Sequence, residues 1–165
     1  MTVHILTTGG TIDKVYFDAK STYAVGDPQI DDILEQVGVT FDFEVETLMR
    51  KDSLEMTDAD RAAIAARVGS SPHQRVLITH GTDTMADTAE ALAATLGPDI
   101  GGKTVVLVGS LAPARFRTTD AEFNIGFACA AVQTLAPGAY LAMNGRVFPA
   151  GHVRKNREAN RFEAV

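Results

Sequence analysis

Hydroxyl, carboxylate and glycine residues follow four apolar runs of this sequence, each at the point where the run ends. The four polar segments are TGGTID at 8–13, KDS at 51–53, HGTDT at 80–84 and GS at 109–110. Strands of a parallel sheet deliver their carboxyl ends to one edge, and ligands bind in the crevice there. The spacing therefore predicts one ligand site assembled from four loops.

The chemistry offered by these segments is that of hydroxyl groups. Thr11 and Thr82 are candidate nucleophiles, but a free hydroxyl is a weak nucleophile unless a base activates it. Asp83, next to Thr82, can bind a cationic group or orient a base. Gly10 and Gly81 permit close backbone approach and leave N–H groups for an oxyanion. The competing interpretation is that each threonine only caps a helix.

Short β-branched runs alternate with longer helical stretches, which predicts an α/β domain. Strands are expected over 3–8, 39–49, 76–79, 104–108 and 139–143, the second of them a half-exposed edge strand because its apolar and acidic residues alternate. Helices are expected to begin at Asp27-Pro28, at the capping box 57–60, after Thr82 and at Thr119. The fold class is a three-layer α/β/α sandwich with a mainly parallel, Rossmann-like sheet, in a single domain over 1–165.

Composition excludes several classes of function. The chain has 165 residues, with 15 Lys and Arg against 21 Asp and Glu and a net charge of -6, so a basic nucleic-acid surface is not expected. No stretch reaches the roughly 20 apolar residues that span a bilayer, and the N-terminus does not read as a signal peptide. With one cysteine, Cys129, these features predict a cytoplasmic protein that does not bind membranes.

Several other motifs receive structural interpretations. The segment 97–104 matches the letters of a phosphate-binding loop, but it closes a helix and precedes a strand, the reverse of the required order. The four histidines lack metal-ligand spacing, and His80 is expected to be a hydrogen-bonded buried residue. Cys129 is expected in a helix core. The loop at 8–26 and the basic last twenty residues are expected to be irregular, the latter a solvated tail.

The motifs together resemble the bacterial-type L-asparaginases. The segments TGGTI at 8–12 and HGTDTM at 80–85 resemble the two signatures of that family. In addition, 20–26 resembles its mobile-loop tyrosine segment, 52–56 its substrate-binding serine segment, and 142–156 the stretch with its lysine. These segments occur in family order and cover nearly the whole chain, which corresponds to the N-terminal domain of the family.

The resemblance implies hydrolysis of L-asparagine to L-aspartate and ammonia, with glutamine as a poorer candidate substrate and no metal or organic cofactor. Thr11 would be the nucleophile, and Tyr23 on a flexible loop would help to activate it. Thr82, Asp83 and Lys155 would activate the water or assist proton transfer. The implied substrate-binding residues are Gly10, Asp52, Ser53, Gly81 and Asp83. A homo-oligomer, dimer or tetramer, is the implied assembly.

Two departures from the family pattern bear on function. The family's usual chain continues into a smaller C-terminal domain that supplies an acidic residue to a neighbouring subunit's site, so this chain resembles a short, single-domain member. Leu54 also stands where many members have a polar substrate contact. Loss of that contact is expected to weaken binding or to change the preference between asparagine and glutamine, by about 1–3 kcal/mol if it leaves a buried group unpaired. The alternatives are an amino-acid sensor that kept the pocket without the chemistry, and an amidase for a different amide.

Overall fold

The computed structural model describes all 165 residues and contains a six-stranded sheet in the order β4-β1-β5-β6-β7-β8. Its strands are β1 (Thr2–Gly9), β4 (Asp42–Lys51), β5 (Arg75–Thr79), β6 (Thr104–Val108), β7 (Gly138–Met143) and β8 (Arg146–Pro149). Neighbours among the first five strands in the sheet pair in parallel, and β8 returns antiparallel to β7. The mainly parallel sheet is confirmed, and so is the position of β4 at its edge.

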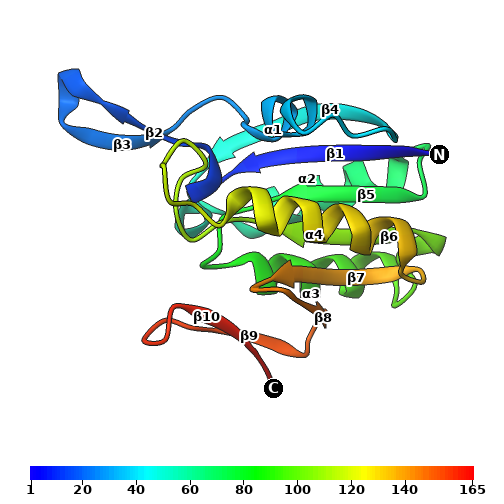
Figure 1. Cartoon of the computed structure of the whole chain (residues 1–165). Helices are drawn as coiled ribbons and strands as arrows, with labels where there is room; N and C mark the ends of the chain where they lie inside the picture. The colour runs from blue at the N-terminus through cyan, green and yellow to red at the C-terminus, as the bar shows by residue number, and fades with distance from the viewer.

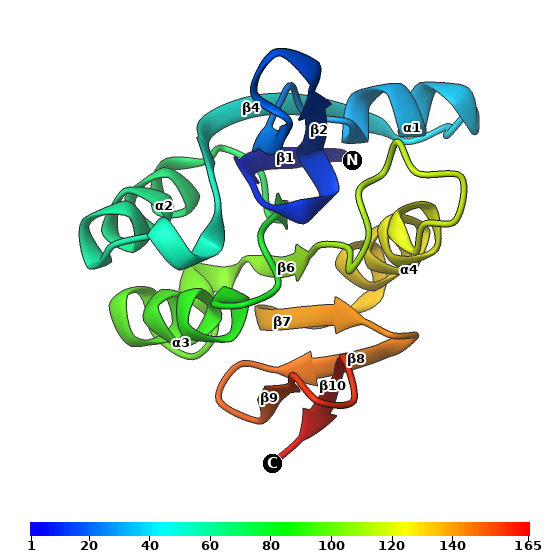
Figure 2. The same ribbon diagram turned by 90° about the vertical axis from the view of Figure 1, so that its left-hand side faces the viewer.

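Four helices cover the two faces of the sheet, as Figures 1 and 2 show. They are α1 (Ile30–Gln36), α2 (Asp58–Ser70), α3 (Met85–Leu96) and α4 (Ala121–Thr134). Helices α2 and α3 pack on one face through side chains such as Ile64 and Leu92, and α1 and α4 pack on the other through Leu34 and Ile125. Strands β5 and β6 lie between the two cores, so both of their faces are apolar.

The helix starts follow local chemistry where a side chain caps the backbone. At α2 the predicted capping box is present, because the Thr57 hydroxyl accepts from Asp60 N and the Asp60 carboxylate accepts from Thr57 N. The predicted start at Asp27-Pro28 is wrong: α1 begins at Ile30, after Gln29. The backbone N–H of Gln29, just before the helix, donates to the buried Asp13 carboxylate. This hydrogen bond between residues that are distant in the sequence lies at the start of α1, where the Asp27-Pro28 pair was expected.

The predicted irregular loop at 8–26 contains two strands. After the short turn η1 (Thr11–Asp13), β2 (Lys14–Phe17) pairs antiparallel with β3 (Thr22–Val25), and η2 (Asp18–Lys20) lies in their connection. This hairpin, β2–β3, projects beyond the carboxyl ends of the parallel strands (Figure 1). The exposed aromatic rings of Tyr16 and Tyr23 have their centroids 5.4 Å apart. Each strand has only four residues, so an alternation of apolar and polar residues is too short to predict this pairing.

The C-terminal residues are not a solvated tail, which corrects the sequence-based expectation. Strand β8 extends the main sheet, and β9 (Val153–Asn156) pairs with β10 (Arg161–Ala164) in a second hairpin. The buried side chains of Phe148, Val153 and Phe162 join the core beside α3. Arg154 and Arg161 alternate with these apolar residues and are exposed, whereas the Lys155 side chain is only 14 % exposed. None of the helices has the length and apolar character needed to span a bilayer.

Replacement of Phe162 by alanine tests whether the β9–β10 hairpin is part of the core. Phe162 is 3 % exposed, so Phe162→Ala should lower the free energy of unfolding by about 3 kcal/mol through lost burial and a cavity. Chemical denaturation measures this change. The control is Phe123→Ala on the surface of α4, which is 63 % exposed and should cost less than about 1 kcal/mol. Equal effects of the two variants would contradict the packing described above.

Candidate functional site

Three loops at the carboxyl ends of β1, β4 and β5 are in direct contact. A Cβ atom built on Gly10 would lie 2.4 Å from Gly81 Cα, and one built on Gly81 would lie 2.6 Å from the Ser53 Cβ. Gly10 also has φ +93°, a conformation that other residues rarely adopt. Gly10 and Gly81 therefore touch, which places Thr11 and Thr82 on adjoining segments. The turn η3 (Ser53–Glu55) completes this floor.

Lys155 joins the β9–β10 hairpin to the loop after β5. Its Nζ lies 2.8 Å from Thr82 Oγ1 and 2.9 Å from Asp83 Oδ1, although 72 residues or more separate them along the chain. Thr82 is 4 % exposed and the Lys155 side chain 14 %. Arg157 Nε lies 3.8 Å from the same Asp83 oxygen, so this carboxylate faces two cations. A threonine hydroxyl thus has a lysine amine within proton-transfer distance.

The loop after β5 is tied to the serine segment as well. Asp83 N donates to Ser53 Oγ at 3.3 Å, and Thr84 Oγ1 donates to Ser53 O at 2.8 Å. Ser53 is 1 % exposed. The neighbouring Leu54, in contrast, is 65 % exposed and directs an apolar side chain to solvent. Leu54 therefore offers no polar group at this position, and the weaker substrate binding expected from it stays a prediction.

Thr11 and Tyr23 line one cavity of about 280 Å³, together with Lys14, Pro113 and Phe116. Thr11 begins the turn η1, and Tyr23 lies on β3 with 52 % of its surface exposed. No hydrogen bond links the two hydroxyl groups. The Tyr23 ring instead contacts Phe116, with ring centroids 5.9 Å apart. The structure thus brings the tyrosine to the rim of the Thr11 cavity without a direct contact to the threonine hydroxyl.

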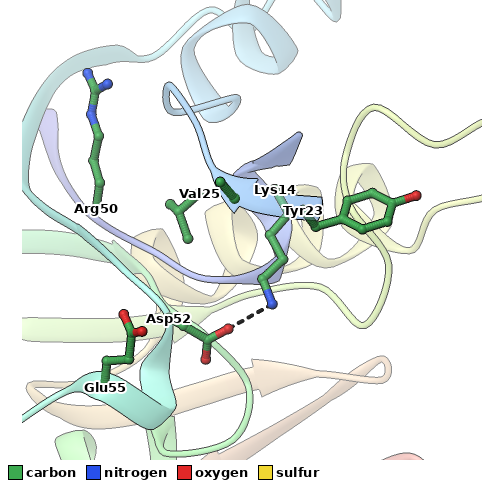
Figure 3. A pocket seen from close by; sticks show the side chains of 7 residues that line it. Lys14, Tyr23, Val25, Arg50, Asp52 and Glu55 are labelled. Atoms are coloured by element: carbon green, nitrogen blue, oxygen red, sulfur yellow. Dashed lines mark ion pairs between the residues drawn. The ribbon is translucent and has the colours of Figure 1, made fainter. Parts of the chain in front are cut away.

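A second cavity, of about 390 Å³, adjoins the first and shares Lys14 and Tyr23 with it (Figure 3). Lys14 Nζ and Asp52 Oδ2 form an ion pair at 2.7 Å that connects the hairpin to the serine segment. The hydrogen bond from Lys14 lowers the pKa of the Asp52 carboxyl, and the Leu54 N–H and the charge of Lys155 act in the same direction. In Figure 3 the Tyr23 side chain points away from this cavity.

A buried carboxylate lies at the base of the hairpin. Asp13 is 2 % exposed; its Oδ1 accepts from Gln29 N at 3.0 Å, and its main-chain oxygen accepts from Gly26 N at 2.8 Å. Burial raises the pKa of Asp13 to about 7, although the Gln29 hydrogen bond and the charge of Arg50 oppose the shift. A second ion pair, Arg50 to Asp27 at 2.7 Å, also ties this base to β4.

The structure also tests whether the candidate threonines cap helices and whether His80 and Cys129 are buried. Neither candidate threonine caps an α-helix, since the residue before α3 is Thr84 and Thr11 is inside η1. His80 is buried, hydrogen-bonded to Gly81 O and Thr88 Oγ1, and burial lowers its pKa to about 4. Cys129 is buried in α4, where burial raises its pKa to about 11.

The segment 97–104 lies between a helix and a strand, as the sequence predicts. It contains η4 (Ile100–Gly102) and leads into β6, so it follows helix α3 and opens no helix of its own. No three His, Cys, Asp or Glu side chains are grouped as metal ligands would be.

Three charged residues of the site were missed in the sequence. Lys14 follows the TGGTI segment by two residues, yet only the hairpin turns its amine toward Asp52. Arg157 belongs to the basic run that the sequence predicts to be solvated, and its place directly after β9 brings it to Asp83. Asp13 looks like an ordinary loop carboxylate, and its burial depends on contacts with 26–29. A weak signal existed for Asp13, which ends the polar segment 8–13, and for Lys14, a cation within three residues of a candidate nucleophile.

Comparison with known families and proteins gives a consistent result over the whole chain. The family model described as asparaginase, N-terminal, matches residues 2–165. The chain is 32 % identical over 162 residues to the probable periplasmic L-asparaginase of Haemophilus influenzae, covering 93 % of this chain and 46 % of that one. It is 30 % identical to the L-asparaginase of Thermococcus kodakarensis, covering 100 % and 51 % of the two chains.

Solved structures agree with this result. The thermostable L-asparaginase from Thermococcus kodakarensis superposes with a TM-score of 0.85 at 28 % identity, over 100 % of this chain and 51 % of that chain. The probable cytoplasmic L-asparaginase from Campylobacter jejuni gives a TM-score of 0.82 at 31 % identity, over 98 % and 52 %. The chain therefore spans about half the length of the relatives it matches, and it shares their α/β fold.

The burial of Asp13 generates a prediction about pH. The Asp13 carboxyl has a pKa of about 7 in the folded protein against 3.8 for an ordinary aspartate, so the folded protein binds the carboxyl proton more tightly than the unfolded chain does. Protonation of Asp13 therefore stabilises the fold at low pH. Its contribution should decline as pH rises from about 4 to about 7. Asp13→Asn does not titrate, so its free energy of unfolding should rise relative to the unmodified chain over this interval and then level off.

Urea denaturation at several pH values measures this difference. Asp18→Asn, at an exposed position in the same hairpin, serves as the control and should show no such trend. A difference for Asp13→Asn that is constant between pH 4 and 8 would show that the carboxyl group keeps its ordinary pKa.

Proposed function

This chain belongs to the asparaginase N-terminal family, and on that premise we propose that it hydrolyses the side-chain amide of L-asparagine to give L-aspartate and ammonia. The observation that carries the proposal is the contact of Lys155 with Thr82 and Asp83, beside the loop that holds Thr11. This arrangement puts one hydroxyl group in contact with an amine, next to the loop that carries the second hydroxyl group, that of Thr11. Glutamine is the proposed poorer substrate.

In the proposed reaction the Thr11 hydroxyl attacks the amide carbonyl and transfers its proton toward the departing nitrogen. The C–N bond breaks, ammonia leaves, and an ester joins the aspartyl group to Thr11 Oγ1. Water then adds to this ester, and aspartate is released as the threonine recovers its proton. Backbone N–H groups beside Gly81 are the proposed donors to the oxyanion formed in each step, since the Gly10 N–H already donates to Lys51 O at 2.9 Å. Tyr23, at the rim of the Thr11 cavity, is the proposed activator of Thr11.

The second step is assigned to Thr82, Asp83 and Lys155. Lys155 lies within 2.8 Å of the Thr82 hydroxyl, so a proton can pass between the amine, the hydroxyl and an attacking water. Asp83 holds the amine in place at 2.9 Å and is the proposed partner of the substrate's ammonium group. Gly10, Gly81, Asp52 and Ser53 form the floor and wall of the substrate site in this proposal.

A cytoplasmic location is part of the proposal. Its support is the single cysteine, which is a buried free thiol, together with the description of the Campylobacter jejuni relative as cytoplasmic. The Haemophilus influenzae relative, in contrast, is described as a probable periplasmic enzyme.

Two threonine variants test the proposed chemistry. Thr11→Ala removes the nucleophile and Thr82→Val removes the hydroxyl that Lys155 contacts. Each should reduce the rate of ammonia release from asparagine by roughly three orders of magnitude or more. The reason is that removing one member of a catalytic set that works as a unit removes most of the rate acceleration. Thr134→Val, at an exposed site on α4, is the matched control and should retain full turnover. Melting temperatures of all three should stay close to that of the unmodified chain.

Near-parental turnover in both site variants would reject the proposed mechanism. Binding of aspartate by calorimetry without any release of ammonia would instead favour an amino-acid sensor. Release of ammonia from other amides but not from asparagine or glutamine would point to an amidase with a different substrate.

The proposal includes a homo-oligomer, because the family's sites border a contact between subunits. Light scattering after size exclusion should therefore give a mass of at least twice 17.6 kDa for the chain. The specific activity should fall on dilution below the dissociation constant of the oligomer. A monomer with full activity at every concentration would reject this part of the proposal.

A further inference from the structure

The Tyr23 ring contacts two other aromatic rings. Its centroid lies 5.4 Å from that of Tyr16 and 5.9 Å from that of Phe116, and the Phe116 pair is edge-to-face with 61° between the ring planes. Such a pair is attractive, because the edge of one ring carries the opposite partial charge to the face of the other. Tyr16 is the partner of Tyr23 across the hairpin, so of the two rings only Phe116 comes from a different part of the chain.

Phe116 lies in the loop between β6 and α4. It is 43 % exposed and belongs to neither core, so its ring is available for contact with the hairpin. In Figure 3 the Tyr23 side chain points toward this loop, which is drawn in yellow-green. Pro113 and Phe116 also line the cavity of about 280 Å³ that contains Thr11. The Phe116 ring is therefore both part of the wall of the reaction cavity and in contact with the proposed activator of Thr11.

Hydrogen bonds fix this loop and connect it to the turn that carries Thr11. The Asp120 carboxylate accepts from Leu111 N, with its two oxygens at 2.9 and 3.0 Å. Ala114 N donates at 3.0 Å to the main-chain oxygen of Ile12, the buried residue that directly follows Thr11. The aromatic ring of the loop and the Thr11 hydroxyl are thus placed by segments that are hydrogen-bonded to each other.

Polar contacts attach the β2–β3 hairpin to the rest of the chain at its base. Lys14, the first residue of β2, pairs with Asp52, and Gly26, just after β3, donates to Asp13 O. Tyr23 lies farther from this base and is 52 % exposed. Its orientation therefore depends on its ring contacts, and the contact from outside the hairpin is the one that relates it to the Thr11 cavity.

We propose that Phe116 is a positioning residue of the reaction: Tyr23 packs against its ring, so the loop between β6 and α4 sets where the Tyr23 hydroxyl lies at the Thr11 cavity. The inference rests on the proposed function, because it takes Tyr23 as the activator of Thr11. The loop after β6 entered the candidate site only through Gly109 and Ser110. It thereby gains a second part in the site, through an aromatic side chain.

Removal of the ring tests this role through kcat. Phe116→Ala should lower kcat for ammonia release from asparagine by about fivefold, the factor that one aromatic pair contributes, and should leave KM within about twofold. The reason is that the change keeps every group proposed to bind the substrate and only frees the tyrosine. Phe116→Tyr keeps a ring at this position and should retain most of the parental kcat.

The matched control is Phe17→Leu. Phe17 is 49 % exposed in the same hairpin and has no ring contact, so its replacement should leave both kcat and KM unchanged. The inference is overturned if Phe116→Ala keeps the parental kcat, or if it raises KM at unchanged kcat, since the ring would then only enclose the substrate. An equal loss of kcat in Phe17→Leu would overturn it as well.

A double-variant cycle asks whether the effect passes through the Tyr23 hydroxyl. Tyr23→Phe keeps the ring but lacks the hydroxyl, so kcat of this variant no longer depends on where that hydroxyl lies. Addition of Phe116→Ala to Tyr23→Phe should therefore lower kcat by less than about twofold. A further fivefold loss in the double variant would show that Phe116 acts independently of Tyr23 and would reject the proposed role.

Hydrogen exchange distinguishes failure of the inference from failure of the proposed function, since it needs no reaction. Backbone amides of β2 and β3 should exchange about fivefold faster in Phe116→Ala than in the unmodified chain, and at the parental rate in Phe116→Tyr. If exchange responds in this way but no amide is hydrolysed, the packing of Tyr23 on Phe116 stands and the proposed function fails. If asparagine is hydrolysed and the hairpin exchanges equally in all variants, the proposed function stands and the inference fails.

Discussion

Contact between backbone segments at the ends of β1, β4 and β5 is the constraint on which the site depends. Gly10 touches Gly81, and Gly81 touches Ser53, at distances that leave no room for a Cβ atom on either glycine. The parallel register of β1 with both β4 and β5 delivers the three loops to this point. Any side chain at Gly10 or Gly81 would separate the loops and move Thr11 away from Thr82.

Ion pairs hold the two hairpins against these loops. The hairpin β2–β3 is tied to the end of β4 by Lys14 with Asp52, and the segment that follows the hairpin is tied there by Asp27 with Arg50. The hairpin β9–β10 is tied to the loop after β5 by Lys155 and Arg157, which share one oxygen of Asp83. Both hairpins therefore meet the sheet through ions at the same edge, and the pairs Lys14–Asp52 and Lys155–Asp83 are partly buried, so salt screens them less than it screens exposed pairs.

Much of the fold could be predicted because the sheet is built from simple patterns. The continuous apolar run at 76–79 and the capping box at Thr57 each report a local preference that the tertiary structure respects. The failures have a common physical cause. The start of α1 depends on the Asp13 carboxylate sixteen residues away, and the two hairpins depend on pairings whose strands are only four residues long. Such short strands have too little periodicity to signal themselves.

The sequence by itself determined the class of the fold, the edge of the sheet that carries the polar loops, and the residue types delivered there, because these follow from local periodicity and from the direction of parallel strands. Only the tertiary structure decided which charges meet. Lys155 reaches Thr82 across 73 positions, and Lys14 reaches Asp52 because a hairpin folds back over the end of β4. Contacts of this kind depend on how distant segments pack, and no pattern within one segment encodes them.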